Sequence, residues 1–188
     1  MKGLLFCLLL LPFSAQAKFL FNYGLNYSSE KDSSSVNQYD KSRIFHKILL
    51  AAAVNGNKTV FFGWGIDSWT SKLNRGSGNS DTYSMLEMGP KIQWYFSDTY
   101  NWYMSAEWNP YAKGTRKKGA TSQSDITGSS TGFGLGYRFK VSRLFGLGAS
   151  IQYHSTALAK ETVGSTQSNI SDTVTHIMPM LEFSMITK

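Results

Sequence analysis

Residues 131–140 read TGFGLGYRFK, and this stretch decides the fold because every second residue in it is large and apolar. One face would carry Phe133, Leu135, Tyr137 and Phe139. The opposite face would carry three glycines, Arg138 and Lys140. A period of two is typical of a β-strand, in which successive side chains point to opposite faces. The stretch therefore predicts a strand with one large, mostly aromatic face and one small or charged face.

Seven further segments repeat this pattern, namely 19–27, 43–54, 59–69, 84–96, 102–110, 145–154 and 175–185. In each, large apolar residues alternate with glycine, polar or charged residues, although His46 interrupts the alternation in 43–54. A strand that crosses a membrane at a tilt needs about 9–11 residues. The eight segments are close to this length, and their even number lets both ends of the chain lie on the same side.

Two features favour a closed barrel in a membrane over a soluble β-sandwich. Glycines on the inner face suit the narrow interior of an eight-stranded barrel, which side chains just fill. The connections alternate between short (55–58, 97–101 and 141–143) and long (28–41, 71–81, 112–130 and 155–172). Such asymmetry is typical of bacterial outer-membrane barrels. We therefore predict an all-β, eight-stranded, antiparallel, up-and-down transmembrane β-barrel with short periplasmic turns and four long extracellular loops.

The composition and the first residues agree with export from the cytoplasm. The chain has 188 residues, of which only 16% are charged, against about 25% in ordinary soluble domains. Residues 1–17 combine Lys2, an apolar run over 4–13 and an A-x-A pattern before Lys18, which predicts a cleaved signal peptide. The run is too short for a spanning helix. Residues 18–188 then form one barrel domain without a disulfide, because the single cysteine, Cys7, lies in the leader.

With its signal peptide, eight alternating strands, unequal connections and the segment GFGLGYRF (132–139), the chain resembles the small outer-membrane barrels of the OmpA-, OmpX- and OmpW-like group. The resemblance covers the whole chain after the leader, and it rests on architecture rather than on a sharp motif. Many such barrels end on an aromatic residue that the assembly machinery reads. Here the last aromatic, Phe183, lies five residues before the end.

The alternation also predicts which charges face the interior: Arg43, Lys47, Lys91, Arg138, Asp67, Glu87, Glu107 and Glu182. Unpaired charges in so narrow a space would be costly, so we expect ion pairs. A symmetric turn at 97–101 would place Lys91 opposite Glu107. The favoured interpretation is a structural network that fills the interior, and resemblance to OmpA-like barrels with an internal salt-bridge cluster implies the same. A gate or a conducting path is the alternative.

Two details follow from the same alternation. The first turn must contain an odd number of residues, because only then do Phe62 and Trp64 face lipid. Rings of aromatic side chains are expected at the two membrane interfaces. The candidates on the short-turn side are Phe19, Trp94, Phe96, Trp102, Phe139, Phe145 and Phe183, and those on the long-loop side are Tyr27, Trp69, Trp108 and Tyr153.

Four cations lie close together in the third long connection: Lys113, Arg116, Lys117 and Lys118. They could contact lipopolysaccharide phosphates or another anionic surface. The alternative is a solvated loop without a ligand. Nucleic acid is not expected, because no aromatic residues for base stacking are interleaved with these charges.

One short motif raises the question of catalysis. His154-Ser155-Thr156 resembles the His-x-Ser pattern of barrel-type lipid A deacylases, but Ser155 follows the histidine directly and would face the other way. No acid is evident beside it, so enzymatic activity is not expected. His46, His154 and His176 stand singly, which gives no support for a metal site, and no cofactor is expected.

The sequence thus predicts a non-enzymatic, monomeric protein of the bacterial outer membrane. It would contact outer-membrane lipid and lipopolysaccharide, and its extracellular loops would serve a structural, adhesive or surface-binding role. A narrow channel or transporter for small or hydrophobic compounds, as OmpW-like resemblance would imply, is the alternative. A lipid A-modifying enzyme is less favoured.

Overall fold

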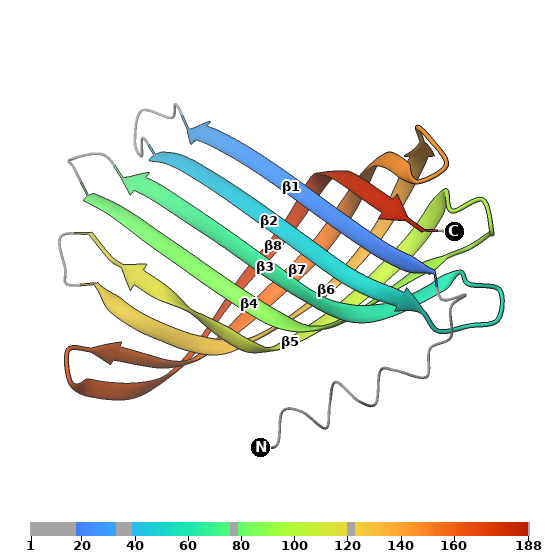
Figure 1. The fold of residues 1–188 in the computed structure, drawn as a ribbon. Coiled ribbons are helices and arrows are strands. Elements are labelled where there is room, and N and C mark those ends of the chain that lie inside the picture. Colours follow the sequence, from blue (N-terminus) through green and yellow to red (C-terminus); the bar gives the residue numbers. More distant parts are fainter. Residues whose placement is uncertain (1–17, 33–38, 76–78, 120–122, 188) are drawn as a thin grey trace, which may run out of the picture.

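The computed structural model describes residues 18–32, 39–75, 79–119 and 123–187, so the predicted signal peptide lies outside the described residues. Eight antiparallel strands follow one another around a ring, and the last pairs with the first to close a barrel (Figure 1). The strands are β1 (Phe19–Asp32), β2 (Tyr39–Ala53), β3 (Val60–Arg75), β4 (Asn79–Tyr95), β5 (Trp102–Lys117), β6 (Ser124–Lys140), β7 (Phe145–Val163) and β8 (Thr166–Ile186). Among the described residues, no helix has the length and apolarity needed to cross a membrane.

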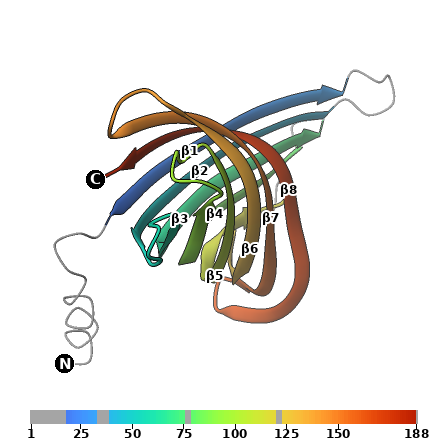
Figure 2. The same ribbon diagram turned by 90° about the vertical axis from the view of Figure 1, so that its right-hand side faces the viewer.

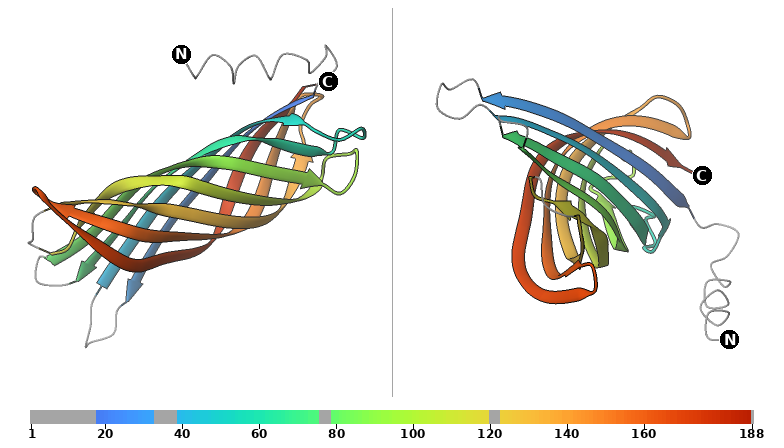
Figure 3. Two further views of the ribbon diagram at one scale, coloured as in Figure 1. Left: turned by 90° about the horizontal axis from the view of Figure 1, so that it is seen from below. Right: turned by 90° about the vertical axis from the view of Figure 1, so that its left-hand side faces the viewer.

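The two ends of the barrel differ. The β2–β3, β4–β5 and β6–β7 turns lie beside the start of β1 and the end of β8, at what we call the terminal end (Figure 1). The β7–β8 turn and the other ends of the strands lie at the opposite, far end, and the tilted strands run between the two ends (Figure 3). This arrangement confirms the predicted up-and-down topology.

The first turn shows how a local structure sets the orientation of a strand. The Val54 amide donates to the Val60 carbonyl over 2.8 Å, which leaves the five residues 55–59 in the loop. Within the loop, Asn55 Oδ1 accepts hydrogen bonds from the Thr59 and Val60 amides. The odd number keeps Phe62 and Trp64 on the outside, where they are 51% and 55% exposed. The predicted odd loop is therefore confirmed.

The strands are longer than the predicted 9–13 residues, at 14 to 21 residues. The connections expected over 28–41, 71–81, 112–130 and 155–172 are mostly strand, and pairing continues as far as Asp32↔Tyr39 and Val163↔Thr166. The apolar alternation ends beyond the apolar belt, which is the band of large apolar side chains on the outer wall. Backbone pairing continues because it does not depend on this alternation. The sequence pattern thus marks the extent of the apolar belt, whereas the hydrogen-bonded sheet continues past it.

The two faces of the sheet differ as predicted, with one exception. Phe133, Leu135 and Phe139 are exposed on the outer wall, while Gly132 and Arg138 are buried inside. Trp69 was expected in an outer aromatic ring and is instead 1% exposed and inside the barrel. Its position has the same parity as the buried Phe61 and Asp67, so the alternation in β3 continues without a break.

The interior is filled in layers. Near the terminal end lies an apolar cluster of Leu20, Leu49, Ala51, Phe61, Tyr95, Tyr103 and Ile186. Toward the far end lies a second one, made of Phe45, Trp69, Met85, Ala112, Ile126, Leu158, Met178 and Met180. Between them sits a layer of charged and polar side chains. Glycine makes room for this filling: a Cβ at Gly136 would fall on the Tyr103 ring.

Candidate functional site

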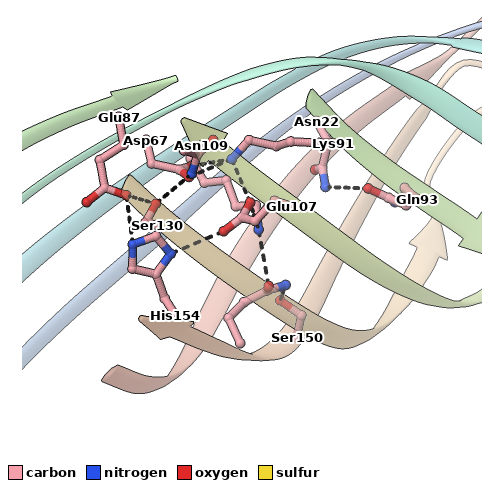
Figure 4. A network of polar contacts seen from close by, with 12 residues as sticks. Asn22, Asp67, Glu87, Lys91, Gln93, Glu107, Asn109, Ser130, Ser150 and His154 are labelled. Atoms are coloured by element: carbon pink, nitrogen blue, oxygen red, sulfur yellow. Dashed lines mark hydrogen bonds and ion pairs between the residues drawn. The ribbon is translucent and has the colours of Figure 1, made fainter. Parts of the chain in front are cut away.

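The middle layer of the interior is a buried polar network centred on Lys91 of β4. Its ammonium group donates to Asp67 and to Glu107, over 2.6 Å in each case (Figure 4). Lys91 and Glu107 face each other across the β4–β5 ladder, as predicted. Lys47 reaches the same Glu107 carboxylate from β2, at 2.8 Å. Each acid therefore lies against a cation, which offsets the cost of burying charge.

A histidine extends this network toward the far end. His154 Nε2 lies 2.9 Å from Glu87 and Nδ1 lies 3.2 Å from Glu107 (Figure 4). Glu87 also accepts hydrogen bonds from the Trp69 indole and the Thr156 hydroxyl, each over 2.8 Å, and from the Ser130 hydroxyl. Asn109 ties the two parts together, because its amide donates to both Asp67 and Ser130 over 3.0 Å.

Glu182 of β8 anchors a second part of the network, nearer the terminal end. Its carboxylate accepts from Asn22 over 3.0 Å, from Ser150 over 2.6 Å and from the Tyr103 hydroxyl. Gln152 contacts both Ser150 and Lys47, so this part joins the Lys91 centre. Side chains from most of the strands thus converge on the axis.

The structure places all eight charges named from the sequence inside the barrel, with Lys47 partly and the others fully buried. Six of them belong to the connected network. Arg138 instead donates to Ser184 and to the Leu144 carbonyl, and Arg43 contacts His176 Nδ1 over 2.8 Å. The alternation did not single out His154, Asn109, Ser130, Asn22 or Gln93 as partners, although all of them share the inward parity.

The network leaves almost no free space. A cavity of about 10 Å³ lies among Lys47, Lys91, Glu107, Gln152 and Glu182, which is room for about one water molecule. Apolar layers cover it on both sides. Among the described residues, the side chains of the two apolar clusters and of the polar network fill the interior around this cavity.

The residues at this centre suit a charge network better than a metal ion. Ligand atoms of Asp67, Glu87 and His154 lie within 4.8 Å of one another, a grouping that single histidines in the sequence did not suggest. The Lys91 ammonium group already donates to the Asp67 carboxylate, and each ring nitrogen of His154 contacts a carboxylate. A metal ion would have to displace the Lys91 ammonium from Asp67 and break a contact between His154 and a carboxylate, so the ligand set is not preorganised for one.

The same centre contains a hydroxyl, a histidine and a carboxylate in contact, as in a nucleophilic triad, but all three side chains are buried. Thr156 Oγ1 lies 3.3 Å from His154 Nε2, and Glu107 lies on the other ring nitrogen. The sequence showed no acid beside His154, and the structure corrects this because it brings two from other strands. Thr156 is fully buried and donates to Glu87, so no substrate reaches it. Ser155 faces outward, where it contacts Thr175.

The four cations expected in an outer loop do not form one group. Arg116 is 7% exposed, inside the barrel, and pairs with Asp172 at 3.0 Å and with Glu161 at 3.7 Å. It is therefore not available to an outside anion, which corrects that prediction. Lys113 and Lys117 are exposed on the outer wall of β5, and Lys118 follows the strand. Strand alternation separates them, because even-numbered residues at this level point inward.

The wall has an incomplete seam between β1 and β8. Their ladder runs only from Leu20↔Ile186 to Leu25↔Leu181, whereas β1 pairs with β2 along its whole length. Beyond this point the two strands run apart toward the far end (Figure 2). The apolar cluster containing Met178 and Met180 lies behind the seam.

A proline explains where the seam opens. The Thr187 amide donates to the Phe19 carbonyl and the Ile186 amide to the Leu144 carbonyl, so odd-numbered residues of β8 direct their amides toward β1. The next bond after Leu25↔Leu181 would need an amide hydrogen from residue 179, which is proline and has none. Asn26 instead donates its side-chain amide to the Pro179 carbonyl over 2.6 Å.

Comparison with known proteins places the fold but not the activity. No protein-family model and no curated protein sequence matches the chain. Among solved structures, the chain is similar to Neisserial surface protein A (NspA), with 13% identity over 92% of this chain and 98% of that one, and a TM-score of 0.50. Outer membrane protein AlkL also matches, with 15% identity over 92% and 90% of the chains and a TM-score of 0.45. The chain thus has the fold of the small eight-stranded outer-membrane barrels.

Proposed function

We propose that this protein is an integral, monomeric barrel of the bacterial outer membrane, inserted after residues 1–17 are cleaved, with a non-enzymatic surface role. The outer wall supports insertion, because it carries large apolar side chains such as Trp64, Phe133 and Leu181 in exposed positions. The ladders between neighbouring strands pair the backbone groups without water, as lipid requires, except along the far-end part of the β1–β8 seam. The terminal end would face the periplasm and the far end the outside, in contact with lipid and lipopolysaccharide.

The plugged interior is the observation that carries a structural, adhesive or surface-binding role rather than conduction. Ions would have to cross two apolar layers and a network whose charges already satisfy one another. The far-end strands then have a different use, as rigid extensions that present polar residues outside the membrane. The sealed Thr156–His154 pair gives no support for an enzyme.

Single-channel recording of the folded protein in planar bilayers tests this proposal. The expected result is no stable open level above the bare bilayer, while folding is confirmed by the mobility shift of the unboiled protein on a gel. Protease added to intact cells should cut only in the far-end connections, such as 118–123. A steady conductance in the unmutated protein would overturn the plugged interior, and cleavage at 97–101 would overturn the orientation.

The seam supports a second candidate function, a lateral route for small apolar compounds. The seam opens on the far-end side of the apolar belt, beside Tyr27 and Ile177, and leads toward the buried cluster around Met178. An apolar molecule in the outer leaflet would reach this cluster beside the Arg43–His176 contact, without crossing the polar network on the axis. Uptake of a fluorescent fatty-acid analogue into vesicles would support the route if a disulfide engineered across the seam stopped it. Equal uptake by protein-free vesicles would contradict it.

A further inference from the structure

The outer wall of β5, β6 and β7 carries a feature that neither the plugged interior nor the seam involves. Lys113 pairs with Thr127, and Thr127 pairs with Lys160, so the three lie in one row across neighbouring strands. Both lysines are exposed. Two strand spacings separate them, or about 10 Å between Cα atoms. Long, flexible lysine side chains can close on one ligand from that distance, with the Thr127 hydroxyl between them.

A hollow lies directly beneath this row. It has a volume of about 480 Å³ and is lined by Tyr111, Pro110 and the small residues Gly128, Ser129, Ala157 and Ala159, together with the row itself. Its cause is visible in the ladders, because register shifts occur at Asn109/Ala112, Thr127/Gly128 and Leu158/Lys160. Bulges bend the strands there, and small side chains leave the resulting space open.

The position of the row matches the headgroup level of a membrane. On the side of the row that faces the terminal end, the outer wall carries the exposed aromatic residues Trp108 and Tyr111 on β5, Phe133 on β6 and Tyr153 on β7. The hollow begins just beyond them and the lysines follow. Aromatic side chains gather at the membrane–water interface, so the ammonium groups would lie where lipid phosphates lie.

The charges at this place favour an anion. Within the part of the chain that the structure describes, Lys113 and Lys160 have no ion-pair partner, in contrast to Arg116, which is paired inside the barrel. The nearest acid on the outer wall is Asp125, which faces Thr115 and Thr162 one row further from the belt. Two cations and a hydroxyl thus stand between the apolar belt and that carboxylate.

We propose that this Lys113–Thr127–Lys160 row binds the phosphate of a phosphorylated outer-leaflet lipid, and that the hollow receives the adjoining sugar or the first carbons of its chains. The proposal rests on membrane insertion as proposed above. Charge-assisted hydrogen bonds from both ammonium groups hold the phosphate. The site commits to a lipid because the lining of the hollow is mostly apolar and includes residues on the side of the row that faces the apolar belt, which a free phosphate ion would not use.

The chain itself supplies a matched control. Lys72, Thr82 and Lys117 form a second row of the same type on β3, β4 and β5, and both lysines are exposed there as well. Lys117 lies four residues further along β5 than Lys113, which is about 13 Å along the strand and about 10 Å further from the belt for a strand tilted by about 40°. This second row has the same charge and spacing but lies too far from the membrane to reach a lipid phosphate.

The test uses full-length mature protein in nanodiscs, with native mass spectrometry to count bound diphosphorylated lipid A. The unmutated protein should retain one lipid, and the double variant Lys113→Gln/Lys160→Gln should lose at least about tenfold in affinity. Lys72→Gln/Lys117→Gln should stay within about twofold. Ala157→Phe, which fills the hollow and keeps both lysines, should also weaken binding. Equal losses in the two lysine pairs would show general charge attraction and overturn the site.

Two further arms identify the ligand. Lipid A stripped of its phosphates should not bind above background, and inorganic phosphate should not displace the bound lipid. Retention of the stripped lipid, or displacement by phosphate alone, would overturn the proposal. If the barrel failed to fold into nanodiscs at all, the proposed function would fail instead, so the two outcomes are distinguishable by the mobility shift on an unboiled gel.

Discussion

Replacing Lys91 with methionine should destabilise the barrel strongly, because this ammonium group lies between two buried acids. It donates to Asp67 and Glu107 over 2.6 Å. The lysine stem passes closely over Gly65. Methionine keeps most of this stem, so the substitution removes the charge while it preserves the packing.

The expected cost follows from what each acid retains. Glu107 keeps Lys47 at 2.8 Å and His154 at 3.2 Å, but Asp67 keeps only neutral donors such as the Asn109 amide at 3.0 Å. Leaving a buried charge without its partner costs about 3–5 kcal/mol. Since Glu107 stays compensated, we expect about 3 kcal/mol, with Asp67 as the main source.

Urea unfolding of protein folded in phosphocholine vesicles, followed by tryptophan fluorescence and by unboiled gel mobility, measures this change. Lys140→Met, at an exposed position where β6 ends, is the control and should change the free energy of unfolding by less than about 0.5 kcal/mol. Lys91→Met/Asp67→Asn should recover at least about 1 kcal/mol, because the orphaned charge is gone. The reasoning is refuted if Lys91→Met costs no more than the control, or if adding Asp67→Asn destabilises it further.

Three further predictions test other parts of the structure. Gly136→Ala should cost about 1–3 kcal/mol in the same unfolding assay, because its Cβ would fall on Tyr103; Gly56→Ala, which has open space around it, should be neutral, and equal effects would contradict the packing. Pro179→Thr should restore an amide hydrogen facing β1 and extend the ladder, so hydrogen exchange at the Ile177 amide, which also faces β1, should slow; unchanged exchange there would remove proline as the cause of the seam. Arg116→Met should lower overall stability by no more than about 1 kcal/mol, since Asp172 is half exposed, yet should speed protease cleavage at the far end; unchanged cleavage would show that this pair does not hold the far-end strands.

The barrel could be predicted from the sequence because lipid and a narrow interior impose opposite demands on alternate residues. Phe133, Leu135 and Phe139 had to face lipid, which left Gly132 and Arg138 for the interior. Lys91 opposite Glu107 followed from one symmetric turn, and the odd first turn followed from Phe62 and Trp64. The limits of the apolar belt could therefore be predicted from the sequence. The ends of the strands could not be predicted in this way, because backbone pairing continues where both faces are polar.

The detailed contacts needed three-dimensional information. His154 meets Glu87 and Glu107 only because β4, β5 and β7 curve around one axis, and no spacing along the chain encodes that. Arg116 looked like a surface cation among neighbours of the same sign, and the alternation that puts Glu107 and Asn109 inside would place it outside. The register shift between Asn109 and Ala112 reverses the parity and turns Arg116 inward, which the sequence pattern did not show. Trp69, in contrast, could have been placed inside by the alternation. The Lys113–Thr127–Lys160 row depends on register and on bulges, which alternation alone does not fix.

The most direct test of the central claim, a closed barrel in lipid with a filled interior, is a series of spin labels on single cysteines introduced along β6 and β7 in place of residues 131–139 and 147–153, in a variant without Cys7. In vesicles, labels at 133, 135, 147 and 151 should collide with dissolved oxygen and be shielded from a water-soluble nickel chelate. Labels at 150 and 152 should be shielded from both. Strong nickel contact at the inward positions would reveal an aqueous pore, and strong nickel contact at the outward positions would show that the apolar wall does not face lipid.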